Sequence, residues 1–243
     1  MLTIGMLVLL AFQLFSACKK KESTEEIQPE PTSGTVSLKL SYNVDGASLL
    51  FDTIHYVNQA GNQYSISKLV YYLSNISFKN ANGNSYETKA IKFIDAQNLA
   101  SNQFSFDGIP NGDYTSIGFL IGIDSLHNQP NGLPANTDNL SMEWPIPMGG
   151  GYHFLRLEGY YRDSCCTPGY AMHLGTNACL ISVNIPHTFS IAGNTVTMQM
   201  KMNVSEWFKN PASYDFNTDG NFSMGNAAAM QKLRQNGVDV FNF

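Results

Sequence analysis

A chain of 243 residues is long enough to bury one large all-β core or two small ones. Only 14% of its residues are charged, 12% are aromatic, and the formal net charge is −5. The aromatic content excludes a disordered chain, and the lack of excess positive charge excludes a protein that follows a nucleic-acid backbone. We therefore expect a folded protein whose partners do not include nucleic acid.

Residues 1–18 have the pattern of a bacterial export signal. Residues 4–15 form an apolar run of signal-peptide length that is too short to span a bilayer comfortably. Small residues, Ser16 and Ala17, precede Cys18, as in the box of bacterial lipoproteins, where this cysteine carries the lipid. We expect a lipid-anchored protein outside the cytoplasm, in the periplasm or on the cell surface. The alternatives are a plain secretory signal or a buried apolar strand.

Residues 19–33 (KKKESTEEIQPEPTS) are polar, charged and rich in proline. Such a segment cannot bury enough apolar area to offset the entropy lost on ordering. We therefore expect a flexible tether between the membrane and a single domain over residues 34–243.

From residue 34 onwards, apolar and polar residues alternate with period two. Residues 36–42 place valine, leucine and tyrosine on one face and serine and lysine on the other, which predicts a half-buried strand. Similar segments follow at residues 64–80, 86–97, 104–109, 114–123, 152–160, 178–185, 188–191 and 195–204. Asparagine and glycine at 82–84, and the sequence PNGD at 110–113, predict turns.

Few windows show a helical period, and residues 225–235 show the clearest one. About eight to ten short strands at this spacing predict an all-β fold, an antiparallel β-sandwich. We expect a short helix at its C-terminal end.

Residues that bind metals or undergo redox chemistry gather between Met142 and Cys179. This stretch holds one of the two tryptophans, two of the five histidines and three of the four cysteines. We expect His153 on the polar face of its strand and His173 on a neighbouring strand. Because adjacent strands lie about 4.8 Å apart, the two imidazoles can meet and bind a metal. An ordinary hydrogen-bonding role for each histidine is the alternative.

Three cysteines, an odd number, lie outside the predicted signal. If Cys18 is lipidated, three thiols remain, which predicts one disulfide and one free thiol in an oxidising compartment. A bridge from Cys166 to Cys179 would close the loop that carries His173, and a bridge from Cys165 to Cys179 is the alternative. A metal site of all three thiols is a further alternative, although the adjacent pair lacks the spacing of common zinc sites.

Residues 215–220 (DFNTDG) resemble the first half of a calcium-binding loop. Asp215, Asn217 and Asp219 offer oxygen ligands at alternate positions, and the glycine that follows permits a sharp turn. The twelfth position of such a loop is normally glutamate but here is Asn226. The alternative is a turn rich in Asp and Asn ahead of the final helix.

Four short motifs follow one another in the order and spacing of a known family. They are GIDSLHN at 122–128, MEW at 142–144, GYHFLRLEG at 151–159 and MHLGTNAC at 172–179. Their succession resembles the MbnP family of methanobactin-associated, extracytoplasmic copper-binding proteins, and the likeness runs from about residue 36 to residue 243.

The resemblance implies a β-sandwich that binds copper through histidines. It also implies that a tryptophan is oxidised to kynurenine by a dihaem peroxidase-like partner. By motif, His127 and His173 match the histidines of the family and Trp144 matches its tryptophan. His153 follows the Gly-Tyr pair, where many relatives carry another residue, and is the third candidate ligand.

No nucleophile elbow, phosphate-binding loop or zinc-protease motif is present in the sequence. We therefore expect a copper-binding protein for copper acquisition or handling, with no turnover chemistry of its own. The competing hypothesis is a cell-surface module that binds a glycan or a protein and uses no metal.

Overall fold

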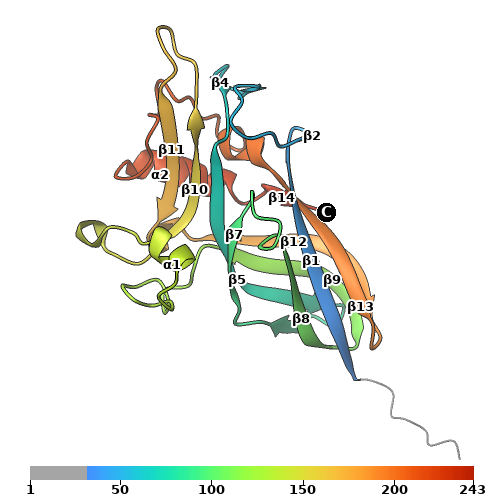
Figure 1. Ribbon diagram of the computed structural model, residues 1–243. Coiled ribbons are helices and arrows are strands. Elements are labelled where there is room, and N and C mark those ends of the chain that lie inside the picture. Colours follow the sequence, from blue (N-terminus) through green and yellow to red (C-terminus); the bar gives the residue numbers. More distant parts are fainter. Residues whose placement is uncertain (1–31) are drawn as a thin grey trace, which may run out of the picture. The chain divides into compact units, whose positions relative to one another are not determined.

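A computed structural model describes residues 32–243 as a sandwich of β-sheets (Figure 1). The predicted signal over residues 1–18, its Cys18 and most of the tether over residues 19–33 lie outside the described residues. The expected all-β fold is confirmed, since strands dominate and helices are short. In residues 32–243, no helix is long and apolar enough to cross a membrane.

The first sheet is built around β1, whose alternating residues were predicted as a half-buried strand. β1 pairs with β13 in parallel, from Thr35 beside Thr195 to Asn43 beside Asn203, and β8 and β2 pair with its other edge. β14 pairs with the far edge of β13. The bounds are β1 (Ser33–Val44), β2 (Ala47–Ser48), β8 (Gln103–Pro110), β13 (Thr195–Asn203) and β14 (Phe241–Asn242).

The second sheet has the order β11-β10-β5-β9-β12, with β6 and β7 paired to parts of β5. Its strands are β5 (Lys68–Asn80), β6 (Ser85–Glu87), β7 (Ile91–Asp95), β9 (Gly112–Ile121), β10 (His153–Tyr160), β11 (Gly169–Gly175) and β12 (Ile181–Ile191). A small ribbon pairs β3 (Tyr56–Val57) with β4 (Gln63–Tyr64). β11 therefore lies at one edge of the larger sheet.

Aromatic side chains join the two sheets across the core. Phe78 of β5 lies edge-on to Phe106 of β8, with ring centroids 5.9 Å apart. Phe241 of β14 contacts Tyr71 of β5 and Phe119 of β9. Such edge-to-face pairs add stabilisation to the burial of apolar area. The three alternating methionines of β13 (Met198, Met200 and Met202) are buried, as their period of two predicts.

Helical segments lie outside the sheets. They are α1 (Thr137–Ser141), α2 (Ala227–Asn236) and the 3-10 turns η1 (Ile146–Met148), η2 (Asn177–Cys179) and η3 (Val204–Phe208). The side chain of Asn226 accepts a hydrogen bond from the Ala229 N–H and so caps α2. α2 buries Ala229 and Leu233 and packs beside β11 (Figure 1). The predicted C-terminal helix is confirmed.

Two local features add to the sequence predictions. The predicted turn at residues 110–113 joins strands of different sheets, because β8 pairs with β1 while β9 pairs with β5 and β12. The segments predicted at 178–185 and 188–191 form one strand, β12. Its pairing is interrupted between Pro186 and Phe189, where the proline cannot donate to the ladder.

We expect the substitution Phe78→Ala to destabilise the domain by about 3–5 kcal/mol, because it removes a fully buried ring that contacts Phe106, Tyr114 and Phe189. Urea unfolding followed by circular dichroism measures the change. Leu99→Ala, at a side chain that is 84% exposed, is the control and should change stability by less than about 0.5 kcal/mol. Equal effects of the two substitutions would contradict this account of the core.

Candidate metal centre

Three rings form a contact series beside the edge strand β11. The centroids of the Trp144 and His153 rings are 4.8 Å apart, and those of His153 and His173 are 4.9 Å apart. The two imidazole planes are nearly perpendicular, at 87°. β10 and β11 are antiparallel neighbours, and this pairing brings the two histidines together as the sequence predicts.

A β-bulge turns His153 toward His173. His173 lies opposite Arg156, and strict alternation along β10 would place residues 153 and 156 on opposite faces of the sheet. The register shifts between His153 and Leu155, so that Phe154 is the extra residue. His153 therefore contacts His173, while Leu155 stays fully buried in the core.

The loop before β10 places Trp144 against His153. The Trp144 N–H donates to the Gly151 carbonyl at 2.8 Å, and the His153 N–H donates to the Met142 carbonyl at 2.6 Å. The indole Nε1–H donates to the Met148 carbonyl at 3.2 Å, and the side chain is 1% exposed. These bonds hold the indole in one orientation.

The triple glycine before Tyr152 makes this loop feasible. Gly149, Gly150 and Gly151 have φ values of 110°, 67° and 88°, a region that residues with a Cβ rarely adopt. A Cβ at Gly151 would also lie 2.4 Å from the Asn128 side-chain oxygen, which accepts the Tyr152 N–H.

Gly175 leaves room for the indole ring of Trp144 because it has no Cβ. It pairs with His153 across the strands, and a Cβ built on it would lie 2.3 Å from Cε3 of Trp144. The ring therefore lies directly on the backbone at the end of β11. This contact explains why a glycine stands two residues after His173 in the motif MHLG.

His153 presents one nitrogen without a partner. Its ring is 7% exposed, and Nδ1 lies 3.1 Å from the Met142 carbonyl, an acceptor only, so the hydrogen-bond network assigns the proton to Nδ1. Nε2 is buried and has no hydrogen-bond partner among the described residues. Burial, together with the charges of His173 and Arg156, lowers the pKa of His153 to about 4. The ring is therefore neutral at pH 7, with a free lone pair on Nε2.

His173 also has one bonded and one unpartnered ring nitrogen, but the two nitrogens exchange roles relative to His153. Its Nε2 lies 2.9 Å from a carboxylate oxygen of Glu158, and its Nδ1 is buried with no partner in residues 32–243. The hydrogen bond with His173 lowers the pKa of Glu158 to about 2, and the charge of Arg156, whose Nη2 lies 2.8 Å from the same oxygen, adds to this shift. The ionised Glu158 therefore accepts the Nε2–H and leaves the lone pair of His173 on Nδ1.

Ser223 fixes the backbone of His173. The His173 N–H donates to the Ser223 hydroxyl at 2.6 Å, and that hydroxyl donates to the His173 carbonyl at 2.7 Å. Neighbouring backbone bonds join Ala171 to Asn221 and Ser223. The segment before α2 thus covers the open edge of β11 and holds the second histidine in place.

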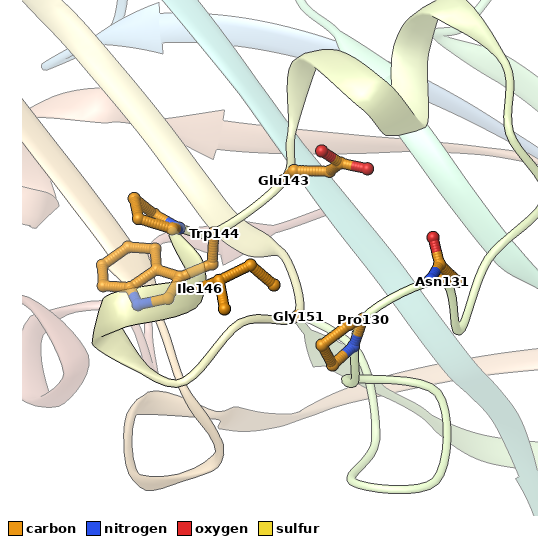
Figure 2. Close-up of a pocket in the computed structure, with 7 residues that line it drawn as sticks. Pro130, Asn131, Glu143, Trp144, Ile146 and Gly151 are labelled. Atoms are coloured by element: carbon orange, nitrogen blue, oxygen red, sulfur yellow. The ribbon is translucent and has the colours of Figure 1, made fainter.

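A hollow of about 320 Å³ lies beside Trp144. Figure 2 shows Pro130 and Asn131 across this hollow from Trp144, with Ile146 next to the indole. Ile146 is 68% exposed, although it is large and apolar. The hollow leads from the surface to the tryptophan side of the ring series.

His127 lies in a different environment from the other two histidines. Its Nδ1 is 2.8 Å from the Asp124 carboxylate, and its ring borders a separate hollow with Tyr72 and Leu133. The loop that carries it reaches the ring series through Asn128, which bonds Tyr152 and Asn177. The ligand role of His127 stays a prediction from the family motif.

The structure differs from the expected disulfide. Cys165, Cys166 and Cys179 are free: the adjacent pair is exposed, and Cys179 is buried. Cys166 precedes β11 and Cys179 follows it, so the length of the strand, roughly 20 Å at about 3.3 Å per residue, separates them. A bridge from either residue of the pair to Cys179 would need Cα atoms within about 7 Å.

In the predicted calcium loop, the carboxylate oxygens that could bind calcium instead contact other groups of the protein. The ammonium group of Lys232 lies 2.7 and 2.8 Å from the two carboxylate oxygens of Asp219. Asp215 accepts hydrogen bonds from Asn62 and from the Asn217 N–H. Asn226, at the twelfth position, caps α2. These contacts favour the alternative, a turn rich in Asp and Asn that leads into the helix.

Sequence reasoning missed the residues that orient the rings. Glu158 shares the exposed face of β10 with Arg156, and period two places them together, but only the register with β11 shows that Glu158 meets His173. The role of Gly175 was equally hidden, because it depends on a contact with Trp144.

The fold and site define the chain as an all-β sandwich with two histidines and a tryptophan in contact at one sheet edge. The profile of the family described as MbnP matches residues 33–227, and the chain belongs to the MbnP family. The solved structure of MbnP from Methylosinus trichosporium is similar, with a TM-score of 0.53 over 77% of this chain and 81% of that chain. The sequences are 12% identical, so this likeness shows the fold. No curated protein matches the chain.

We expect Gly175→Ala to displace Trp144 and to destabilise the domain by about 1–3 kcal/mol, because the added methyl group enters the space of the indole. Urea unfolding measures the stability, and the difference in fluorescence from a Trp144→Phe variant reports the environment of the indole. Gly169→Ala is the matched control on the same strand, since a Cβ there meets its nearest atom at 3.6 Å. Identical behaviour of the two alanine variants would contradict the close approach.

We expect the metal-free protein to lose stability as the pH falls from 6.5 to 4. The folded-state pKa of His153 is about 4, below the ordinary value of 6.5, so the unfolded chain binds this proton first. The loss attributable to His153 is roughly 3 kcal/mol at 1.36 kcal/mol per pH unit. Glu158, with a folded pKa of about 2 against 4.5, lowers stability further below pH 4.5.

Urea unfolding at a series of pH values tests this expectation. His153→Gln should reduce the dependence on pH between 6.5 and 4, whereas Leu99→Ala, at an exposed side chain without an ionisable group, is the control with the wild-type profile. A wild-type slope retained in His153→Gln would contradict the assignment.

Proposed function

We propose that the protein binds copper between Nε2 of His153 and Nδ1 of His173. The observation that carries the proposal is the pair of buried imidazole nitrogens, on contacting rings, that have no partner among the described residues. A buried polar atom without a partner costs about 1–3 kcal/mol. A metal ion that accepts both lone pairs removes this cost.

The surroundings of the two rings are those of metal ligands. Each ring gives its N–H to a protein acceptor, the Met142 carbonyl for His153 and the Glu158 carboxylate for His173. Such outer contacts fix the tautomer and orientation of metal-binding histidines. Imidazole suits copper, zinc and nickel alike, and membership in the MbnP family favours copper.

We further propose that Trp144 is the tryptophan that the family resemblance marks for oxidation to kynurenine. Its ring contacts His153, and the hollow bordered by Ile146 gives a partner a way to approach it. The oxidising equivalents would come from a dihaem peroxidase-like partner. When bound, copper supplies a redox-active centre beside this ring, while the protein orients the rings and limits the access of water.

In this proposal the protein serves copper acquisition or handling outside the cytoplasm and performs no turnover of its own. Lipidation at Cys18 would hold it at the membrane. The competing hypothesis of a glycan-binding or protein-binding module gives no reason for two unpartnered nitrogens on contacting rings.

We expect purified, untagged protein to hold one copper ion per chain that depends on both imidazoles. Copper analysis and the electron paramagnetic resonance spectrum of the Cu(II) form should show that this ion is lost in the His153→Ala/His173→Ala variant. His187→Ala is the control and should keep it. A His127→Ala variant decides whether that residue adds a third ligand, since the affinity would then fall by at least about tenfold.

Copper that stays in the double variant with an unchanged spectrum would refute the two-histidine site. Wild-type protein that takes up no copper would refute copper binding altogether. Intact mass, before and after incubation with the oxidising partner, decides the fate of Trp144.

A further inference from the structure

A second group of metal-binding side chains lies at the opposite end of the β10–β11 hairpin. The loop over residues 161–168 joins the two strands and extends away from α1 (Figure 1), at the end of β10 opposite His153. Its Cys165 and Cys166 sulfur atoms are 2.7 Å apart, and the Cys166 sulfur is 3.4 Å from a carboxylate oxygen of Asp163. The ligand atoms of the three residues all lie within 4.8 Å of one another.

The loop is folded so that these side chains converge. Neighbouring residues in extended chain point to opposite sides, so adjacent thiols normally diverge. Here one oxygen of Asp163 accepts the N–H groups of Cys165 at 2.8 Å and of Cys166 at 2.7 Å. The Asp163 N–H donates to the Cys166 carbonyl at 3.1 Å. This turn brings both thiols and the second carboxylate oxygen to the same place.

Packing does not account for the two cysteines. A free cysteine that serves packing is normally buried, as Cys179 is under α2, whereas Cys165 and Cys166 are both exposed. Exposed free thiols are normally avoided on protein surfaces where they have no use. The exposure of Cys165 and Cys166 therefore favours a chemical role over a packing role.

We propose that Cys165 and Cys166, held together by Asp163, form a surface site for Cu(I), separate from the two-histidine centre. Thiolates are soft ligands that select Cu(I). Cu(I) accepts a low coordination number, whereas structural zinc takes a closed set of four ligands, of which this loop presents three. The two thiols release their protons to solvent when the ion binds, so the affinity rises with pH.

Exposure allows this site to exchange its ion with other molecules. The ring series is buried, with His153 at 7% exposure, while the thiols stand on a loop at the surface. The two sites also differ in ligand type, since one offers nitrogen and the other sulfur. Each can therefore be tested while the other is intact.

Anaerobic Cu(I) titration against a chelating competitor, with a reductant present, tests the proposal. All proteins carry Cys18→Ser, which removes the thiol outside the described residues. We expect Cys165→Ser/Cys166→Ser to take up one Cu(I) per chain fewer than its parent, and Cys179→Ser to take up the same amount. Asp163→Asn keeps an acceptor for the turn but loses its charge, and should weaken this binding by at least about tenfold.

X-ray absorption at the copper edge distinguishes the two sites. The His153→Ala/His173→Ala variant loaded with one equivalent of Cu(I) should show sulfur neighbours, with a far-ultraviolet circular dichroism spectrum like that of its parent. Equal uptake by the Cys165→Ser/Cys166→Ser variant and its parent would overturn the proposal. A copper spectrum with only nitrogen and oxygen neighbours would also overturn it, whatever the two-histidine centre does.

Discussion

The register between β10 and β11 is the constraint on which the proposed metal centre depends. It sets Arg156 opposite His173, and the bulge at Phe154 then turns His153 toward the same imidazole. Without the extra residue, alternation would place His153 on the other face of the sheet. One backbone irregularity therefore determines whether two histidines form a pair.

Hydrogen bonds around His153 and His173 determine which ring nitrogen of each histidine carries the lone pair. Ionised Glu158 fixes the tautomer of His173, and the Met142 carbonyl fixes that of His153. Gly175 lets the indole of Trp144 lie directly on β11, and this packing covers one side of the ring series. The proposed centre is thus organised without a metal, which would reduce the ordering that metal binding requires.

Alternation along the chain was enough to predict the sandwich, the helical period of residues 225–235 predicted the final helix, and the spacing of neighbouring strands predicted that His153 and His173 could meet. These patterns were not enough for features that depend on tertiary neighbours, such as the bulge that turns His153 to the face of His173. The crossover at residues 110–113 depends on which sheet offers β8 a partner, and the ammonium of Lys232 at Asp219 comes from a distant helix. The expected disulfide disregarded the length of β11, which keeps Cys179 far from the exposed pair. The family motifs identified His127 and His173, but only the structure shows that His127 borders a different hollow from the one beside Trp144.

The parallel pairing of β1 with β13 has a consequence for how the protein is made. The first long strand of the domain has no partner along one edge until the chain has been synthesised past Asn203. Contacts between such distant segments are slow to form, because a long loop must close before they stabilise anything. Much of the chain must therefore emerge before the domain closes.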